Sequence, residues 1–125
     1  QLIKYPVRGI DLKQSPGGLI DIEFTAQILC LQKNILSKNA STLSMLEALK
    51  NNRLIKAYSY IRGLEQLLSL VSGTTLHHWS TGTNESLRLA QLLKTDESNI
   101  DQKVTTVMTE ASALVKDLDP IFAPG

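Results

Sequence analysis

The sequence predicts an all-α protein, an antiparallel helical bundle of about five helices with a short extended N-terminal arm. From Ser15 onward, apolar residues recur at three- and four-residue steps, as they do along one face of a helix. The links between these periodic stretches are short, which is typical of helices that lie antiparallel to their sequence neighbours.

The N-terminal arm is expected to be extended. Val7, Ile10 and Leu12 alternate with other residues, and Pro6 and Gly9 interrupt the pattern. An irregular strand pair or an extended arm fits this pattern, and alone it cannot make a sheet. Because the chain starts without an initiator methionine, we expect it to be a piece of a longer protein.

Five stretches carry the helical period, at about residues 18–34, 42–51, 54–72, 84–94 and 99–119. The first is apolar on most sides, as expected of the helix at the buried centre of a bundle. Ser41 and Thr83 are placed as the N-caps of the second and fourth helices. Ser98 and Asp101 form a capping box for the fifth, and Pro120 marks its end.

The composition argues against nucleic-acid binding and against a membrane protein. A chain of 125 residues with 13 basic and 12 acidic side chains is one domain of net charge +1, without a bulk field for nucleic acid or a membrane. No apolar stretch is long enough to span a membrane. The single cysteine, Cys30, excludes a disulfide within the chain; we expect a buried thiol and a cytoplasmic protein.

The loop at 73–82 contains His77, His78 and Trp79. No Asp, Glu or Cys lies at metal-ligand spacing from the histidines, so we expect a structural role, with Trp79 closing one end of the bundle.

The most informative stretch joins the arm to the first helix. Lys13 and Pro16 precede the pair Gly17-Gly18, and a helix follows. Glycines before a helix leave backbone N–H groups uncovered where anions are favoured, and Lys13 adds a positive charge. This is a candidate phosphate contact without the spacing of a P-loop, and an ordinary tight turn is the commoner alternative.

Two carboxylates follow on that helix. Asp21 and Glu23 are two residues apart, about 200° around the helix, so they cannot act as a dyad. The charge of Asp21 complements the positive helix N-terminus. Glu23 lies among apolar neighbours and is predicted to pair with a buried cation such as Arg62. Arg62 and Glu65 are predicted to pair within their own helix.

Two motifs carry a family resemblance. Residues 13–27, with the pattern K-x-x-x-G-G-x-x-D-I-E-F-x-x-Q, resemble a stretch of the bacterial glutamine synthetase adenylyltransferases that opens the helical domain after each nucleotidyltransferase domain. Residues 57–68, AYSYIRGLEQLL, are similar to another helix of that domain, and to a helical domain of the PII uridylyltransferases.

The resemblance implies a domain division and partners. Residues 1–14 would be the tail of a preceding nucleotidyltransferase domain, and 15–125 the helical bundle domain. The parent enzyme would use ATP and Mg²⁺ to transfer AMP to a tyrosine of glutamine synthetase, and would remove it phosphorolytically, under PII-protein control. The implied partners are the chain's own nucleotidyltransferase domain, glutamine synthetase and the PII protein.

The resemblance also assigns roles. Lys13, Gly17, Gly18 and Asp21 become candidate nucleotide-proximal residues, and Asp21 would face the nucleotide of the neighbouring catalytic domain. Glu23, Arg62 and Glu65 become structural or orienting residues; Arg62 and Glu65 either pair within their helix or orient the catalytic domain.

The chain is expected to hold no catalytic residue, metal or cofactor of its own. Nucleotidyltransferases of this kind hold two Mg²⁺ ions on an Asp-x-Asp that follows a Gly-Ser turn. The sequence offers only Asp117-x-Asp119, which ends a helix. We therefore expect the fragment to be inactive alone. The end of the chain at 122–125 favours the C-terminal, adenylylating half of the parent. The alternative is a free-standing helical interaction module.

Overall fold

The computed structural model describes residues 9–35 and 41–118 and confirms an all-α helical bundle. In chain order the described elements are β1 (Ile10–Asp11), α1 (Leu19–Gln32), α2 (Thr42–Ala48), α3 (Asn52–Ser72), β2 (His78–Trp79), α4 (Asn84–Leu92) and α5 (Glu97–Leu118). The predictions at Pro6, Val7, Asp119, Pro120 and 122–125 lie outside the described residues.

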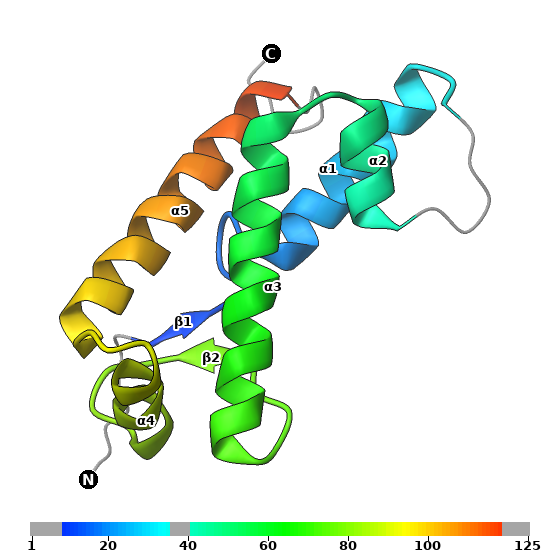
Figure 1. Cartoon of the computed structure of the whole chain (residues 1–125). Coiled ribbons are helices and arrows are strands. Elements are labelled where there is room, and N and C mark those ends of the chain that lie inside the picture. The colour runs from blue at the N-terminus through cyan, green and yellow to red at the C-terminus, as the bar shows by residue number, and fades with distance from the viewer. Residues whose placement is uncertain (1–8, 36–40, 119–125) are drawn as a thin grey trace, which may run out of the picture.

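Helix α3 is the centre of the bundle, because it contacts each of the other four described helices. Figure 1 shows α5 along one side of α3, α1 and α2 at the other side of its upper part, and α4 near its lower end. The prediction that the first helix is the buried centre is wrong. Ile20 is 42% exposed and Leu31 is 70% exposed, so α1 presents an apolar stripe to the surface.

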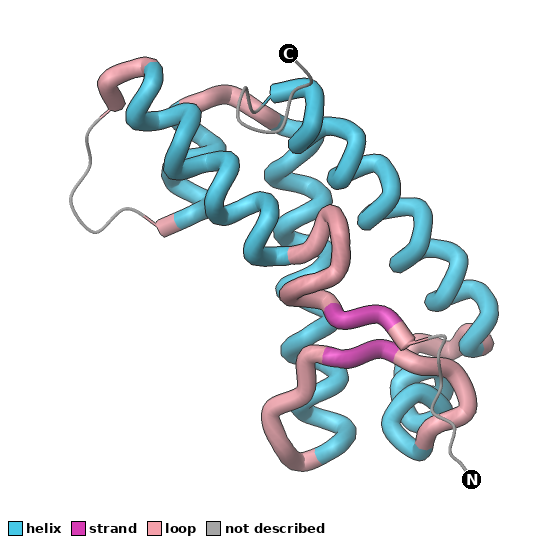
Figure 2. The backbone as a smooth tube through the Cα atoms, turned by 180° about the vertical axis from the view of Figure 1, so that it is seen from behind, coloured by secondary structure: helices cyan, strands magenta, loops and turns pink. Residues whose placement is uncertain are grey.

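The arm joins the bundle through a small sheet. β1 pairs antiparallel with β2, with Ile10 opposite Trp79, and the N–H of Leu12 donates to the carbonyl of His77 at 2.7 Å. The second strand comes from the loop at 73–82, so the arm forms a sheet only with a partner from the bundle. Figure 2 shows both strands from behind. Leu12, immediately after β1, is fully buried in the core.

Trp79 is fully buried, and its Nε1–H donates to Asp101 Oδ1 on α5 at 2.8 Å. This bond fixes the sheet against the start of α5 and holds Trp79 in the core. It also overturns the predicted capping box, because Asp101 is bonded to Trp79. Helix α5 begins at Glu97, and Asp96 Oδ1 accepts the N–H of Asn99 at 2.9 Å.

Other helix ends agree more closely with the sequence. Ser41 and Thr83 cap α2 and α4 as predicted, by accepting the N–H groups of Ser44 and Ser86. The predicted second helix was too long, since α2 ends at Ala48. Helix α3 begins at Asn52, two residues earlier than expected. The side chain of Asn51 caps it.

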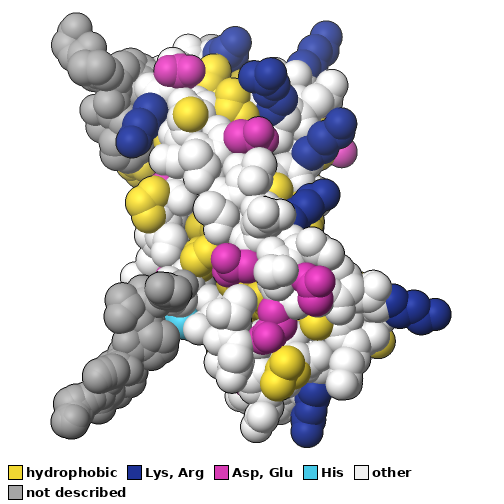
Figure 3. Space-filling view, turned by 90° about the vertical axis from the view of Figure 1, so that its left-hand side faces the viewer, with side chains coloured by type: hydrophobic (Ala, Val, Ile, Leu, Met, Phe, Trp, Pro, Cys, Tyr) yellow, Lys and Arg dark blue, Asp and Glu magenta, His cyan; other side chains and the backbone are white. Residues whose placement is uncertain are grey.

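The surface carries both signs of charge. Figure 3 looks onto the side of the molecule where α5 lies and shows basic and acidic side chains on the same face, with apolar patches between them. None of the described helices is both long enough and apolar enough to cross a bilayer.

Candidate functional site

The turn into α1 is held by its own side chains. Asp11 Oδ1 accepts the N–H groups of Lys13 and Gln14, each at 2.9 Å, and the N–H of Asp11 donates to Ser15 Oγ at 3.0 Å. The N–H of Ser15 in turn donates to the Asp11 carbonyl at 3.0 Å. Asp favours such local turns because its short carboxylate reaches the backbone two and three residues on.

Both glycines of the turn are required by close approach. Gly17 has φ of 80°, and a Cβ there would lie 2.0 Å from the carbonyl oxygen of Met108 on α5. A Cβ on Gly18 would lie 2.7 Å from the carbonyl oxygen of Leu12. The turn therefore brings backbone against backbone, which only glycine permits without a shift.

The N–H groups at this helix start have partners within the chain. Gly17 donates to Asp21 Oδ2 at 2.9 Å, and Gly18 donates to the carbonyl of Ser15 at 2.8 Å. The next two N–H groups, at 19 and 20, donate to the carbonyls of residues 12 and 13 at 2.9 and 3.0 Å. The expectation that the glycines leave uncovered N–H groups is wrong, because Asp21 and Ser15 accept the two glycine N–H groups and the carbonyls of residues 12 and 13 accept the next two. The tight-turn alternative is confirmed.

Asp21 is half-buried and complements the helix start, as its first-turn position indicates. Lys13 is also half-buried, and its own backbone belongs to the locked turn. Whether Lys13, Gly17, Gly18 or Asp21 contacts a nucleotide stays a prediction.

Glu23 connects α1 to α3 through a tyrosine. Its Oε2 accepts the hydroxyl of Tyr58 at 2.9 Å. Burial, together with the hydrogen bond and charge of Glu23, raises the pKa of Tyr58 above its usual value. The predicted pair of Glu23 with Arg62 is wrong. Arg62 is 47% exposed and pairs within its own helix, with Glu65 at 3.0 Å, as the i, i+3 spacing predicts.

Glu65 connects α3 to the segment before β2. It is only 6% exposed, and its second carboxylate oxygen contacts His77 Nδ1. Sequence reasoning missed this contact and the Tyr58–Glu23 bond. The position of Tyr58 on the same side of α3 as Arg62 was a local signal. His77 had none, because it meets Glu65 only after the chain reverses at Gly73.

The buried face of α1 carries two further side chains with polar atoms, Cys30 and Thr25. Cys30 is 4% exposed, as expected of a buried thiol. Thr25 is fully buried, and its Oγ1 has no hydrogen-bond partner in the described part of the chain. Within the same described residues, no three His, Cys, Asp or Glu side chains gather closely enough to hold a metal ion.

Comparison with known proteins places this helical chain in a family. The family model described as GlnD PII-uridylyltransferase matches residues 4–123. The bifunctional glutamine synthetase adenylyltransferase/adenylyl-removing enzyme of Shewanella loihica is 39% identical over 82 residues. That alignment covers 55% of this chain and 9% of the relative's length. No solved structure matches the chain.

The family match extends over nearly all of the sequence and includes the locked turn, α1 and α3, whose motifs carried the resemblance. The chain therefore belongs to the GlnD PII-uridylyltransferase family, and it is similar to a part of a glutamine synthetase adenylyltransferase.

Proposed function

We propose that the chain is a non-catalytic helical domain of a cytoplasmic glutamine synthetase adenylyltransferase. The observation that carries this proposal is the 39% identity to an enzyme named for adenylyl transfer and adenylyl removal. The sequence adds that no Asp-x-Asp follows a Gly-Ser turn, so the carboxylates that would hold Mg²⁺ for ATP lie in another domain. The intact enzyme then modifies a tyrosine of glutamine synthetase with AMP, and removes it, under PII control.

The domain's role is to hold the catalytic domain in place. The turn at 11–18 is rigid, because its side chains and its glycines fix it against α1 and α5. It joins the extended arm to the bundle and presents Lys13 at the junction. An ammonium at that junction reaches the phosphates of a nucleotide held by the preceding domain, where a charge-assisted contact is strong. In this proposal Lys13 and Asp21 face that nucleotide.

A second candidate is supported by the family description, which names PII-uridylyltransferase. In that case the intact enzyme transfers UMP to the PII protein, and the same helical domain supports a different nucleotide specificity. The two candidates differ in nucleotide and acceptor.

The test uses nucleotides labelled at the α-phosphate. An intact polypeptide that includes residues 1–125 is incubated with Mg²⁺ and either ATP plus glutamine synthetase or UTP plus PII protein. Label on glutamine synthetase from ATP supports the first candidate, and label on PII from UTP alone would replace it with the second. Residues 1–125 by themselves are expected to label neither acceptor; labelling by this fragment would overturn the non-catalytic role.

A further inference from the structure

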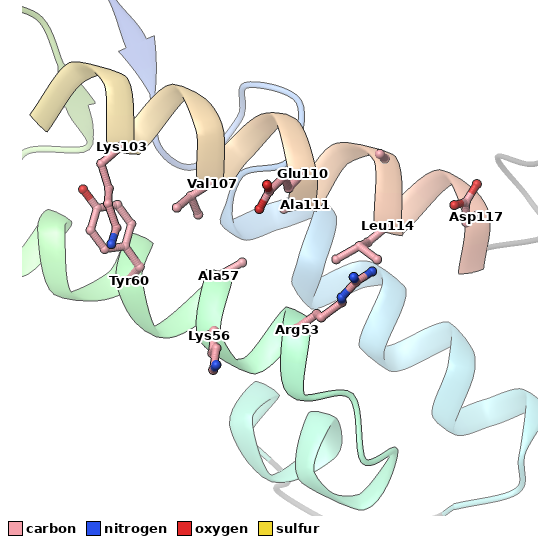
Figure 4. Close-up of a pocket in the computed structure, with 11 residues that line it drawn as sticks. Arg53, Lys56, Ala57, Tyr60, Lys103, Val107, Glu110, Ala111, Leu114 and Asp117 are labelled. Atoms are coloured by element: carbon pink, nitrogen blue, oxygen red, sulfur yellow. The ribbon is translucent and has the colours of Figure 1, made fainter. Parts of the chain in front are cut away.

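A groove of about 500 Å³ runs between α3 and α5, and its described lining includes no residue of the turn at 11–18. Figure 4 shows α5 along one wall and α3 along the other, with α1 behind them. Its floor contains two buried alanines, Ala57 on α3 and Ala111 on α5. The half-buried Val107 and Leu114 extend this apolar floor. Small residues on facing helices leave a hollow that a larger apolar side chain from elsewhere can fill.

Apart from Lys103, which lies on α5 at one end, the two walls carry opposite charges. Arg53 and Lys56 are exposed on α3, and Glu110 and Asp117 are exposed on α5. In the described part of the chain, both ion pairs within 4.0 Å are centred on Glu65, so none of these four charged groups has an ionic partner. The walls thus offer a basic edge and an acidic edge on either side of an apolar floor.

One end of the groove is formed by an aromatic contact. The ammonium of Lys103 lies 5.4 Å from the centre of the Tyr60 ring, a cation–π distance. From Lys103 to Asp117 the groove follows α5 for about four turns, roughly 21 Å at 1.5 Å per residue. This length and the apolar floor suit a helix that lies along the groove.

We propose that the groove binds an amphipathic helix from outside residues 1–125 of the intact polypeptide. Its apolar stripe fills the hollow over Ala57 and Ala111. Its acidic flank faces Arg53 and Lys56, and its basic flank faces the α5 carboxylates. A helix bound between two antiparallel helices completes the packing that bundles use.

The inference that the helix belongs to the same polypeptide rests on the proposed function. The aligned segment covers 9% of the similar enzyme, so an intact protein of that kind has ample chain to supply a helix. A second copy of this chain fits less well. In a symmetric dimer the two grooves would face each other and leave a cavity, which would destabilise the complex.

The groove is tested with a fluorescent peptide of about 18 residues, long enough for four to five helical turns. The probe has an apolar stripe, glutamates along one flank and lysines along the other. The control peptide has the same residues, with glutamate and lysine alternating on both flanks. Turning a helix end to end exchanges its flanks, so the probe has one complementary direction and the control has none. Fluorescence anisotropy measures binding to residues 1–125.

The probe is expected to bind about tenfold more tightly than the control at low salt, with the difference shrinking as salt is added. The double variant Arg53→Glu/Lys56→Glu should weaken probe binding by about tenfold or more. The matched variant Lys33→Glu/Lys94→Glu makes the same charge change at exposed sites away from the groove and should bind as the parent does. Equal affinities for probe and control, or an unaffected groove variant, would overturn the inference.

Probe binding by the intact polypeptide tests whether the helix comes from the same chain. It should bind the probe at least about tenfold more weakly than residues 1–125, because its own helix competes at high effective concentration. Equal binding by the two would show that the occupant is not in the same polypeptide. A dimer of residues 1–125 that dissociates in Arg53→Glu/Lys56→Glu, seen by sedimentation, would assign the groove to a second copy and also overturn the proposal. Neither result depends on AMP labelling, so the proposed function can fail separately.

Discussion

Gly17 illustrates how one residue type supports two interpretations. A glycine before a helix is compatible with a phosphate cradle, and it is also what a tight backbone contact requires. In this protein the residue has φ of 80° and meets the Met108 carbonyl of α5, so its first role is in folding. A loss of activity in a glycine variant would therefore report on folding before it reports on a ligand.

We expect Gly17→Ala to lower the free energy of unfolding by about 3 kcal/mol or more, because it adds a steric clash with the α5 backbone to a strained φ. Gly63→Ala is the matched control. A Cβ there meets nothing within 4 Å, and the residue lies inside α3, so alanine should stabilise by about 0.5–1 kcal/mol. Urea unfolding followed by circular dichroism measures both. An unchanged midpoint for Gly17→Ala would contradict the close approach.

Asp96 makes the start of α5 sensitive to acid. Hydrogen bonds from the Asn99 N–H and the Ser98 hydroxyl lower the pKa of this carboxyl. A lowered pKa adds stability above the unfolded value of about 3.9, and this stability is lost as the pH falls through the folded value.

We therefore expect the thermal midpoint of the parent to fall more steeply below about pH 4 than that of Asp96→Asn, whose amide oxygen still accepts but does not titrate. Asp96→Ala should melt below the parent at neutral pH, where its cap is missing. Thermal scans over a pH series compare the three proteins. If the thermal midpoints of the parent and Asp96→Asn fell equally steeply at low pH, these bonds would contribute nothing to the acid dependence of stability.

At the scale of elements, the hydroxyl of Tyr58 on α3 donates to Glu23 on α1 and so connects the two helices. The raised pKa of Tyr58 gives this bond a pH dependence in the alkaline range. Its contribution is complete below the ordinary tyrosine pKa of about 10 and is lost as the pH rises through the higher folded value.

Removing the hydroxyl in Tyr58→Phe should lower the free energy of unfolding by about 1 kcal/mol at neutral pH, the usual net value of one hydrogen bond. Glu23→Ala should lower stability in the same direction. Tyr60→Phe is the control, because that ring is also on α3 and no side chain accepts its hydroxyl in the described part of the chain. Chemical denaturation distinguishes them: equal stabilities for the Tyr58 and Tyr60 variants would show that the connection between α1 and α3 is unimportant.

At the scale of the whole molecule, the junction between arm and bundle is where the domain meets the rest of the enzyme in our proposal. The arm is fixed to the bundle by the β1–β2 pairing and by the buried Leu12. Lys13 follows Leu12 directly and is half-buried. Its backbone is fixed in the turn, so the side chain extends from a fixed position.

Lys13→Ala in the intact enzyme should reduce turnover or ATP affinity by about tenfold or more, the loss of one charge-assisted phosphate contact. The same change in residues 1–125 should leave stability nearly unaltered, since the turn is held by Asp11 and not by the lysine side chain. Lys33→Ala, at the exposed end of α1, provides the kinetic control. Unchanged kinetics for Lys13→Ala in both directions of the reaction would remove the lysine from the nucleotide site.

The sequence by itself determined the class of fold, most helix positions and the family. Apolar spacing is a property of one helix, so the period alone located α3 and α5 to within two residues at each described end. The caps at Ser41 and Thr83 act over three residues and were readable for the same reason. The motifs at 13–27 and 57–68 predicted the family, and the match over residues 4–123 confirms it.

Only the tertiary structure decided which polar groups meet. Glu23 was predicted to pair with Arg62, but the rotation of α1 against α3 places it against Tyr58, on the same side of α3. Asp101 fits a capping box in the sequence, but in the structure its carboxylate accepts a hydrogen bond from the buried indole of Trp79. The first two N–H groups of α1 donate to the carbonyls of residues 12 and 13, and these residues follow a strand that pairs with β2, contributed by residues almost seventy positions later in the chain. Contacts between separate elements depend on their relative rotation and distance, and these are set by packing of the whole core rather than by local spacing.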